Sequence, residues 1–462
     1  MQIYNTMSRK KEELIPLKPG EISMYVCGPT VYNFFHIGNA RPFVVFDTMR
    51  RYLEHKGYNV TFIQNFTDID DKLIRKANEE GITLQEVADR YIKEYYTDAD
   101  ALGVERATCN PRATEHVDQI IKLVETLVEK GHAYATDTGD VYFSVRSFPG
   151  YGKLSGQSID DLDSGARIDP TEQKHDPLDF ALWKGAKPGE PAWPTPWGMG
   201  RPGWHIECSA MSMELLGPTF DIHAGGQDLI FPHHENEIAQ SEAATGLPFA
   251  RYWMHNGYIN VDNQKMSKSL GNFRLVRDIS AEFDLEAVRL FLLGTHYRNP
   301  VNFSRELVEQ SETALSRIRT ARERLAEAPV GASPEADTAF MEAIDGHRAA
   351  FYAAMDDDLN TADALGAFFD FIRALNTFVS EPHGKAALDK AAGLFEDVAS
   401  VFGILQHKKE EDVPAEALSL LDERAEARKA KNWARADEIR DQLKALGFMV
   451  EDSKEGAKLK KL

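Results

Sequence analysis

Residues 21–65 read EISMYVCGPTVYNFFHIGNARPFVVFDTMRRYLEHKGYNVTFIQN. The apolar run Glu21–Cys27 predicts a short buried strand, and Asn59–Asn65 predicts a second one. Between them, Pro42–His55 carries apolar residues at helical spacing. Because a strand, a helix and a strand at this spacing form a βαβ unit, we predict an α/β fold with a doubly wound parallel sheet.

The composition is that of a globular protein with several domains. The chain has 462 residues, of which 43% are hydrophobic and 27% charged, and this length exceeds what one core usually organises. There is no run of eighteen apolar residues and no signal-peptide core after Met1, so we expect no membrane span. Three scattered cysteines are too few for a disulfide framework, which favours a reducing, cytoplasmic location.

The charge is unevenly distributed along the chain. The formal net charge is −20, which argues against a protein coated by nucleic acid, because phosphate neutralisation needs clustered Lys and Arg. Arg424–Leu462 nevertheless has eleven basic and seven acidic residues, a net of +4 that leaves −24 on the rest. A local RNA footprint and an acidic enzyme with a basic surface helix fit these numbers equally well.

Later segments continue the α/β pattern before it gives way to helices. From Ser304 onward successive amphipathic helices, without a strand pattern between them, predict a bundle. A last module begins near Pro414, after an acidic linker. The elements expected before the bundle are a helix over Glu115–Lys130, a hairpin over Ala133–Val145, a loop-bearing insertion over Phe148–Gly203, a strand at Phe220–His223 and a helix through His233–Ala244.

Two short motifs have the residue types that hold phosphates. His36-Ile37-Gly38-Asn39 lies between the first strand and its helix, where a glycine and a helix N-terminus favour an anionic ligand. Lys265-Met266-Ser267-Lys268-Ser269 places two lysines three residues apart, in a segment able to grip pyrophosphate. Taken alone, each motif is better explained as an ordinary loop histidine or a solvated lysine turn.

A further set of residues has the chemistry of a zinc site. Cys27 ends the first strand, Cys208 lies much later, and His233 and Glu237 are four residues apart on a predicted helix, facing the same side. Two thiolates, an imidazole and a carboxylate suit zinc. Geometry alone also allows His205 as a ligand, and buried free cysteines beside a capped polar helix explain the same residues without a metal.

The conjunction of motifs resembles known enzymes. In this order, and about 230 residues apart, the two phosphate motifs resemble the HIGH and KMSKS signatures of class I aminoacyl-tRNA synthetases. Further segments resemble the cysteinyl-tRNA synthetase family, and the likeness covers nearly the whole chain. These segments are CGPTVY (27–32), FTDIDD (66–71), GWHIECS (203–209) and FPHHENEIAQ (231–240).

The resemblance implies an ATP site. His36, Gly38 and Asn39 would contact the nucleotide, while Lys265 and Lys268 would hold the departing pyrophosphate. His36, Asn39 and the two lysines would be the catalytic residues, acting by positioning and charge stabilisation. Mg²⁺ is expected with the ATP. Asn39 departs from the final histidine of the signature, and it can donate a hydrogen bond but cannot become cationic.

The resemblance also implies a zinc site that selects L-cysteine. The substrate thiolate would join one Zn²⁺ per chain, and serine would be excluded because zinc strongly favours thiolate over hydroxyl. The implied ligands are Cys27, Cys208, His233 and Glu237, with His234 outside the first coordination sphere. Thr67, Trp204 and His223 would wall the amino-acid pocket, although packing explains each of them equally well.

At the C-terminal end, the resemblance implies a module that binds the anticodon of tRNA(Cys), whose 3′ end would receive the cysteine. Basic residues flank a tryptophan there, a combination suited to stacking on unpaired bases. A plain amphipathic surface helix explains the same pattern. The expected contacts are Arg428, Trp433, Asp437 and Asp452. Residues 455–461 depart from the family's pattern, and the family likeness further implies a monomer.

The resulting plan divides the chain into five parts. The nearest rival function is a cysteine ligase acting on an amino-sugar inositol, for which the last two parts are expendable. A tRNA-binding regulator without catalysis would need neither the paired lysines nor the zinc set. The parts are a Rossmann-like catalytic domain at 1–115 and 200–245, a connective-peptide insertion at 116–199, a KMSKS-bearing region at 246–303, a helical bundle at 304–409 and an anticodon-binding module at 414–462.

Overall fold

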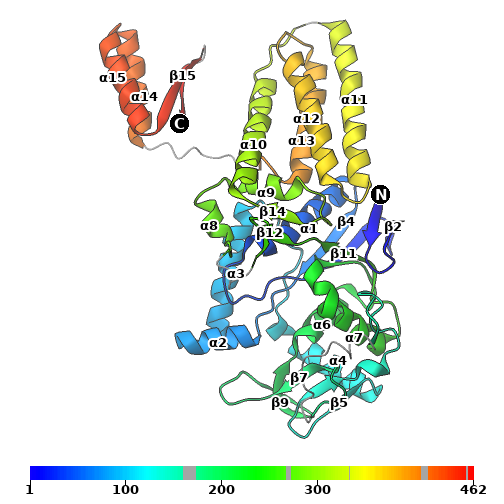
Figure 1. Ribbon diagram of the computed structural model, residues 1–462. Coiled ribbons are helices and arrows are strands. Elements are labelled where there is room, and N and C mark those ends of the chain that lie inside the picture. The colour runs from blue at the N-terminus through cyan, green and yellow to red at the C-terminus, as the bar shows by residue number, and fades with distance from the viewer. Residues whose placement is uncertain (160–172, 267–271, 332, 407–414, 454–455, 462) are drawn as a thin grey trace. The chain divides into compact units, whose positions relative to one another are not determined.

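The computed structural model divides into two compact units, Met1–Gln406 and His407–Leu462 (Figure 1). It describes the whole chain except residues 160–172, 267–271, 332, 407–414, 454–455 and 462. Within the described residues, none of the helices has the length and apolar character needed to cross a membrane.

A parallel sheet forms the centre of the first unit, as the sequence predicted. Its strands follow the order β11-β10-β3-β4, and Val26 of β3 lies opposite Gln64 on one side and Ala224 on the other. The strand β11 lies beyond residue 245, where we expected the catalytic domain to end. The bounds are β3 Glu21–Val26, β4 Asn59–Gln64, β10 Phe220–Gly226 and β11 Ala250–Asn256.

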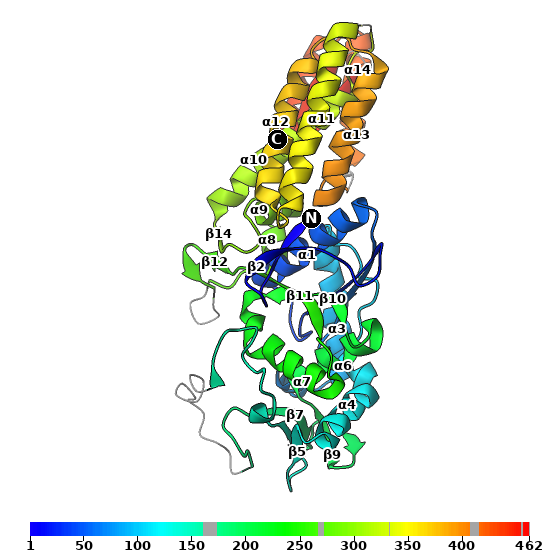
Figure 2. The same ribbon diagram turned by 90° about the vertical axis from the view of Figure 1, so that its right-hand side faces the viewer.

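Helices cover both faces of this sheet (Figure 2). Alternate residues of β3 point to opposite sides, so Met24 packs in the core that contains α1, whereas Tyr25 and Cys27 pack in the core that contains α6 and α7. The sheet is therefore doubly wound. The bounds are α1 Ile37–His55, α6 Trp204–Leu216 and α7 Glu235–Thr245.

The helix α1 begins five residues before its predicted start at Pro42. His36 and Asn39 form a capping box at its N-terminus, each side chain bonding the other residue's main chain. Pro42 therefore lies inside the helix. The prediction placed the boundary too late because proline usually marks the first turn of a helix rather than its second.

The segment predicted as a loop-bearing insertion contains strands. Three of them complete a five-stranded antiparallel sheet in the order β5-β6-β7-β9-β8, and α4 packs against it. The strands are short and rich in Gly, Pro and Trp, so the sequence shows no alternating pattern there. The bounds are α4 Val117–Glu129, β5 Ala133–Ala135, β6 Val141–Phe143, β7 Phe180–Gly185, β8 Trp193–Thr195 and β9 Gly198–Pro202.

Smaller elements connect the sheet to the helical part of the unit. A hairpin of β1 and β2 begins the chain, α2 and α3 follow β4, and β12 pairs with both β13 and β14. The bounds are β1 Gln2–Asn5, β2 Lys10–Glu13, α2 Asp71–Glu80, α3 Leu84–Ala101, β12 Ile259–Val261, β13 Gln264–Lys265, α8 Val276–Ser280, α9 Leu285–Leu293 and β14 Val301–Phe303.

The predicted helical bundle consists of α10, α11, α12 and α13 (Figure 1). Aromatic side chains fill its core: the rings of Phe368 and Phe395 lie 5.1 Å apart, edge to face, and both are buried. The bounds are α10 Arg305–Ala326, α11 Pro334–Asp356, α12 Thr361–Phe378 and α13 Lys385–Phe402.

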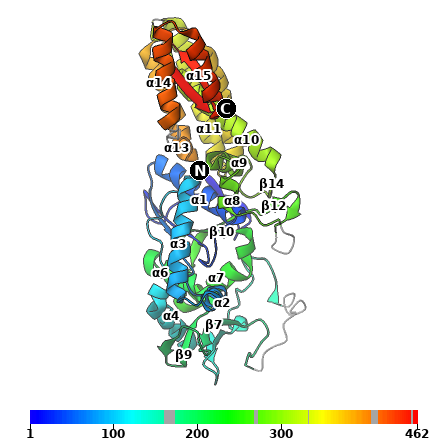
Figure 3. The same cartoon turned by 90° about the vertical axis from the view of Figure 1, so that its left-hand side faces the viewer.

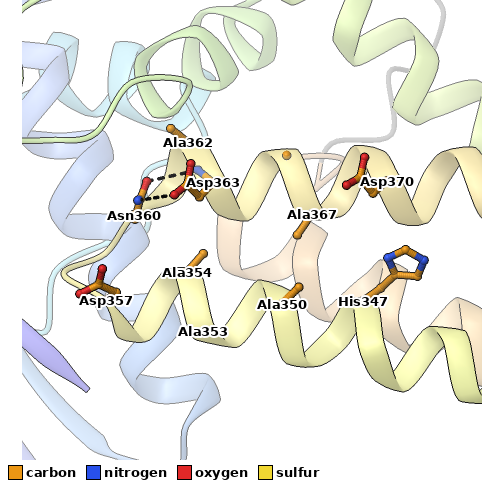
Figure 4. A pocket seen from close by; sticks show the side chains of 11 residues that line it. His347, Ala350, Ala353, Ala354, Asp357, Asn360, Ala362, Asp363, Ala367 and Asp370 are labelled. Carbon is orange, nitrogen blue, oxygen red and sulfur yellow. Dashed lines mark hydrogen bonds between the residues drawn. The ribbon is translucent and has the colours of Figure 1, made fainter.

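A groove of about 580 Å³ runs between α11 and α12 (Figure 4). Alanines form much of its wall, and Asp357, Asp363 and Asp370 give it an acidic lining. Asn360 caps α12 at one end and accepts a hydrogen bond from the main-chain nitrogen of Asp363. Such a lining repels phosphate, so this groove does not suit a nucleic-acid backbone.

The second unit pairs two helices with a β-hairpin (Figure 3). Its small core contains Ala417, Ile439, Leu443 and Phe448. The hairpin was absent from the predicted elements. The bounds are α14 Ala415–Lys429, α15 Trp433–Ala445, β15 Phe448–Ser453 and β16 Gly456–Lys461.

Truncation of Phe395 tests the bundle core. Phe395→Ala removes a ring that is 1% exposed, so the free energy of unfolding should fall by about 3–5 kcal/mol, measured from the denaturant midpoint. Arg373→Ala changes an exposed side chain on α12 and is the control, with almost no expected effect. Equal midpoints for the two variants would contradict the packing described.

Candidate active site and metal centre

A cleft of about 540 Å³ opens at the carboxyl ends of the parallel strands, where open α/β sheets bind ligands. It brings together five residues named from the sequence, which are Cys27, His36, Gly38, Asn39 and Trp204. The loop after β3, the start of α1, and the ends of β10 and β11 form most of its wall. Further lining residues include Gly226, Asp228, Asn256, Gly257, Tyr258, Ile259, Met266 and Phe273.

The first phosphate motif forms the N-terminus of α1. The Nδ1 atom of His36 accepts a hydrogen bond from the main-chain nitrogen of Asn39 at 3.2 Å, and Asn39 Oδ1 accepts one from His36 N at 3.4 Å. Since Nδ1 is an acceptor, the neutral ring carries its proton on Nε2. The asparagine at the last position of the motif thus has a structural role in capping this helix.

A side chain at position 38 would crowd two neighbouring side chains. A Cβ atom there would lie 2.9 Å from His36 Nδ1 and 3.0 Å from the terminal carbon of Met266. The backbone of the first motif therefore approaches the second motif closely.

The segment that follows the second phosphate motif lies beside the first motif. Ile37 N donates to Arg274 O at 3.0 Å, Val276 N donates to Phe35 O at 3.2 Å, and the His36 and Phe273 rings meet edge to face. The main chain of Lys265 ends β13. Lys268 falls outside the described residues, as does the side chain of Lys265. The segments on both sides of the lysine loop nevertheless border the cleft.

Cys27, Cys208, His233 and Glu237 form a buried cluster. Their candidate ligand atoms all lie within 4.8 Å of one another, with 4.0 Å between the two Sγ atoms and 3.0 Å between His233 Nε2 and Glu237 Oε1. Four tetrahedral zinc ligands are about 3.3–3.8 Å apart. Small adjustments would therefore let this cluster hold zinc.

Each member of this cluster comes from a different part of the fold. Cys27 follows β3, Cys208 lies in the second turn of α6 and Glu237 lies in the first turn of α7. His233 was predicted on the same helix as Glu237, but it lies in a π-helical turn, η4 (Ile230–His234), before α7. The predicted proximity of His233 to Glu237 is nevertheless observed.

A second combination shares two residues with the first. The ligand atoms of Cys27, His223, His234 and Glu237 also lie within 4.8 Å of one another. His234 Nε2 is 3.3 Å from Cys27 Sγ, and its Nδ1 is 2.8 Å from His255 Nε2. The described geometry therefore permits either His233 with Cys208 or His223 with His234.

His205, which geometry alone allowed as a ligand, belongs to neither combination. Its Nδ1 lies 2.9 Å from His233 Nδ1. Burial lowers the pKa of His205 to about 3, so this ring is neutral and can accept a hydrogen bond from His233. A partner of this kind fixes the orientation of a metal-binding histidine.

The cluster has strongly shifted acidities. Burial raises the pKa of Cys27, whereas a hydrogen bond from Cys27 and the neighbouring His233 lower that of Cys208 to about 6. Burial alone would raise the pKa of Glu237, but His223 and His233 lower it to about 2. Burial alone would lower the pKa of His233, but Glu237 and Cys208 raise it to about 10. Without a metal, a protonated His233 thus lies beside a carboxylate and a readily ionised thiol, and a metal ion could replace that proton.

The three predicted pocket residues lie at different depths. Trp204 is 42% exposed, lines the cleft and stacks on His233 with 4.3 Å between ring centroids. Thr67 and His223 are buried and lie outside the cleft lining. Thr67 Oγ1 donates to Glu207 at 3.0 Å, and His223 Nε2 lies 2.8 Å from Glu237. Thus His223 contacts a member of the cluster directly, and Thr67 contacts the residue that precedes Cys208.

Asp228 lines the cleft but was missed by the sequence analysis. It follows β10 in the sequence Gly225-Gly226-Gln227-Asp228. The signal that could have revealed it is positional, because a carboxylate directly after a parallel strand reaches the same edge as Cys27 and His36. The strand was predicted to end at His223, three residues too early, so this position was not recognised.

The predicted RNA contacts of the second unit lie on its two helices and on β15. Arg428 lies in the last turn of α14 and Trp433 starts α15, and both are exposed. Trp433 is 58% exposed. Asp437 is exposed and pairs with Arg440 at 3.2 Å. Asp452 belongs to β15, and its side chain is outside the description.

Comparisons with known proteins agree with this architecture. Residues 13–313 match the tRNA synthetases class I (C) catalytic domain, 350–406 the DALR domain and 410–458 the cysteinyl-tRNA ligase anticodon binding domain. Over the full length of both chains, the protein is 57% identical to a cysteine–tRNA ligase of Caldicellulosiruptor saccharolyticus.

Solved structures show the same fold. The methionyl-tRNA synthetase of Mycobacterium tuberculosis with methionyl-adenylate has a TM-score of 0.59 at 16% identity, covering 83% of this chain and 89% of that one. The LeuRS–tRNA–LeuAMS complex of Agrobacterium radiobacter K84 has a TM-score of 0.59 at 12% identity, covering 85% of both chains.

The parallel sheet, its cleft and the family match define a class I aminoacyl-tRNA synthetase. Within that class, the chain belongs to the cysteine–tRNA ligase family.

Replacement of Glu237 tests the charge balance of the metal-free cluster. The pKa of this carboxyl is about 2 in the fold, below its ordinary 4.5, so it stabilises the fold above about pH 4.5 and this contribution disappears as the pH falls toward 2. With a chelator present, Glu237→Gln should lower the unfolding midpoint strongly at pH 7 and much less at pH 3.

The matched control is Glu242→Gln on the same helix, whose carboxylate pairs with Lys153 at a more exposed position. Its effect at pH 7 should be smaller than that of Glu237→Gln. Circular dichroism at both pH values measures the midpoints, and an equal loss for Glu237→Gln at pH 7 and pH 3 would contradict the charged state assigned to the carboxyl.

Proposed function

We propose that this cysteine–tRNA ligase selects its amino acid by binding the cysteine thiolate to zinc at Cys27, Cys208, His233 and Glu237. The observation that carries this proposal is the burial of two thiols, an imidazole and a carboxylate within 4.8 Å of one another behind a cleft that also contains His36. The donor set suits zinc, and Trp204, stacked on His233, extends from the cluster to the cleft.

The zinc would act as a soft Lewis acid that favours a thiolate over a hydroxyl. An apolar pocket separates such similar substrates by only about 1–3 kcal/mol, whereas a site that binds the distinguishing group directly reaches about 10⁴–10⁵-fold. This difference explains why cysteine can be separated from serine in one pocket. His205 would keep the His233 ring oriented, and Thr67 and His223 would support the pocket from behind.

The nucleotide would occupy the rest of the cleft. His36 presents its Nε2 proton at the N-terminus of α1, where the helix dipole favours the α-phosphate of ATP. Gly38 allows the phosphates to approach the backbone, and Asn39 holds the loop by capping the helix. Lys265 and Lys268 would hold the departing pyrophosphate with Mg²⁺, so the cysteine carboxylate attacks in line without a protein nucleophile.

The second unit would bind the anticodon of tRNA(Cys). The match of residues 410–458 to an anticodon binding domain favours tRNA over an amino-sugar inositol as the cysteine acceptor. Trp433 offers an exposed ring for base stacking, and Arg428, Asp437 and Asp452 offer charged groups for base edges or backbone.

Enzyme assays test this proposal directly. Pyrophosphate exchange should depend on L-cysteine, should be about 10⁴-fold or more weaker with L-serine, and should be followed by charging of tRNA(Cys). If exchange depended on cysteine while no tRNA became charged, the amino-sugar ligase would replace this function.

Removal of Cys208 tests the metal. Cys208→Ser should lose bound zinc in elemental analysis and weaken cysteine binding in calorimetry, because serine is a poor zinc ligand. Cys109→Ser is the matched control, since Cys109 belongs to neither cluster, and it should keep one zinc per chain. Stoichiometric zinc in Cys208→Ser would remove this residue from the ligand set.

Two histidine variants separate the alternative ligand sets. His233→Asn should abolish zinc binding, whereas His234→Asn should leave the metal content unchanged if His234 lies outside the first coordination sphere. The opposite result would assign the metal to Cys27, His223, His234 and Glu237.

A further inference from the structure

We infer that Arg41 is a positioning residue that joins the His36 loop to the hairpin carrying Lys265. The inference rests on the proposed ATP roles of these two motifs and adds a residue that neither motif contains. Arg41 lies in the second turn of α1 and its side chain is completely buried. Because it is not among the residues that line the cleft, it acts through its neighbours.

The guanidinium of Arg41 donates to four main-chain carbonyls. Nη1 donates to Gly257 O at 2.7 Å and to Tyr258 O at 2.9 Å. Nη2 donates to Asn299 O at 2.5 Å and to His296 O at 3.4 Å. These bonds use all four N–H groups of the two terminal nitrogens, and they bind two chain segments to α1.

The two segments are the starting points of neighbouring strands. Gly257 and Tyr258 line the cleft and lead into β12, while Asn299 leads into β14. Because β12 pairs with both β14 and β13, and β13 ends at Lys265, the carbonyls held by Arg41 are the base of the lysine hairpin. Arg41 therefore holds the base of that hairpin against the helix that His36 caps, while the main-chain bonds of Ile37 and Val276 hold the segment that follows the lysine loop.

The two segments pack closely against each other where Arg41 binds them. Gly257 N donates to Tyr297 O at 2.8 Å, and Val301 N donates to Tyr258 O at 3.0 Å. A Cβ atom at Gly257 would lie 2.6 Å from the carbonyl oxygen of Asn299. A side chain at position 257 would thus force apart the same segments that Arg41 holds together.

The chemistry of the site requires arginine. Burial lowers the pKa of Arg41 to about 10, so the group stays protonated at neutral pH. A lysine would keep the charge, but its three N–H groups radiate from one atom and cannot reach two pairs of carbonyls. The planar fork of arginine binds both segments at once.

The variant Arg41→Lys tests this role by comparing the two steps of the reaction. Misplacement of reacting groups by about 1 Å costs on the order of 10²-fold in rate, so kcat for cysteine-dependent pyrophosphate exchange should fall by about that factor. The hairpin holds pyrophosphate, which has left before transfer begins. Single-turnover transfer from preformed cysteinyl-adenylate to tRNA should therefore keep its wild-type rate.

Arg289→Lys is the matched control. Arg289 is equally buried, and it donates to the carbonyls of Leu102, Gly103 and Phe402 and to Asp47, away from the cleft. This variant should lower the thermal midpoint without slowing exchange relative to transfer. A selective loss of exchange in Arg289→Lys, or equal losses of both steps in Arg41→Lys, would overturn the inference.

Gly257→Ala perturbs the same junction from the opposite side and should reproduce the selective loss. If Arg41→Lys fails to fold, the rates of exchange and transfer in Gly257→Ala test the inference. If neither variant folds, the junction serves folding alone and the inference is wrong. Absence of cysteine-dependent exchange in the unmodified protein would instead overturn the proposed function, so the two failures are distinguishable.

Discussion

The register between β3 and β10 determines where the candidate site forms. Val26 lies opposite Ala224, and Cys27 N donates to Ala224 O at 3.1 Å, so the Cys27 thiol leaves the sheet on the side of α6 and α7. A slip of one residue would turn this thiol toward α1. It would also separate the thiol from Cys208 and Glu237. The cluster of Cys27, Cys208, His233 and Glu237 therefore depends on a hydrogen-bond pattern of the main chain.

Burial makes the charges of this cluster costly in free energy unless they are paired. Glu237 is fully buried and accepts from His223 and His233, while two thiols lie close to its carboxylate. Isolated charges in such a place are costly unless they are paired. Histidines on several sides provide this compensation in the metal-free protein, and a divalent cation would provide it more completely. The buried charge of Glu237 therefore explains why two histidines, His223 and His233, bond to its carboxylate.

The sequence predicted the parallel sheet well because its strands are continuous apolar runs, as in Glu21–Cys27 and Asn59–Asn65. It failed in the insertion, where the strands β7 to β9 are short and interrupted by glycine and proline. His233 lies in the π-helical turn η4 rather than in α7 itself, and its predicted proximity to Glu237 is observed because this turn leads directly into α7.

Other features of the site depend on contacts between distant segments. No local pattern reveals that Arg41 meets the carbonyls of Gly257 and Asn299, or that His205 contacts the His233 ring without belonging to either candidate ligand set. The capping role of Asn39 could have been predicted from the sequence, because a polar residue three positions after the N-cap residue is typical of a capping box.

The separation of the cluster residues along the chain has a consequence for synthesis in the cell. Cys27 and Cys208 are 181 residues apart, and Glu237 is translated later still. A growing chain therefore exposes its first thiol long before any partner exists, and the parallel pairing of β3 with β10 must wait for the same reason. Capture of a metal by this cluster would be a late event, and it would stabilise only those chains that have already formed the central sheet.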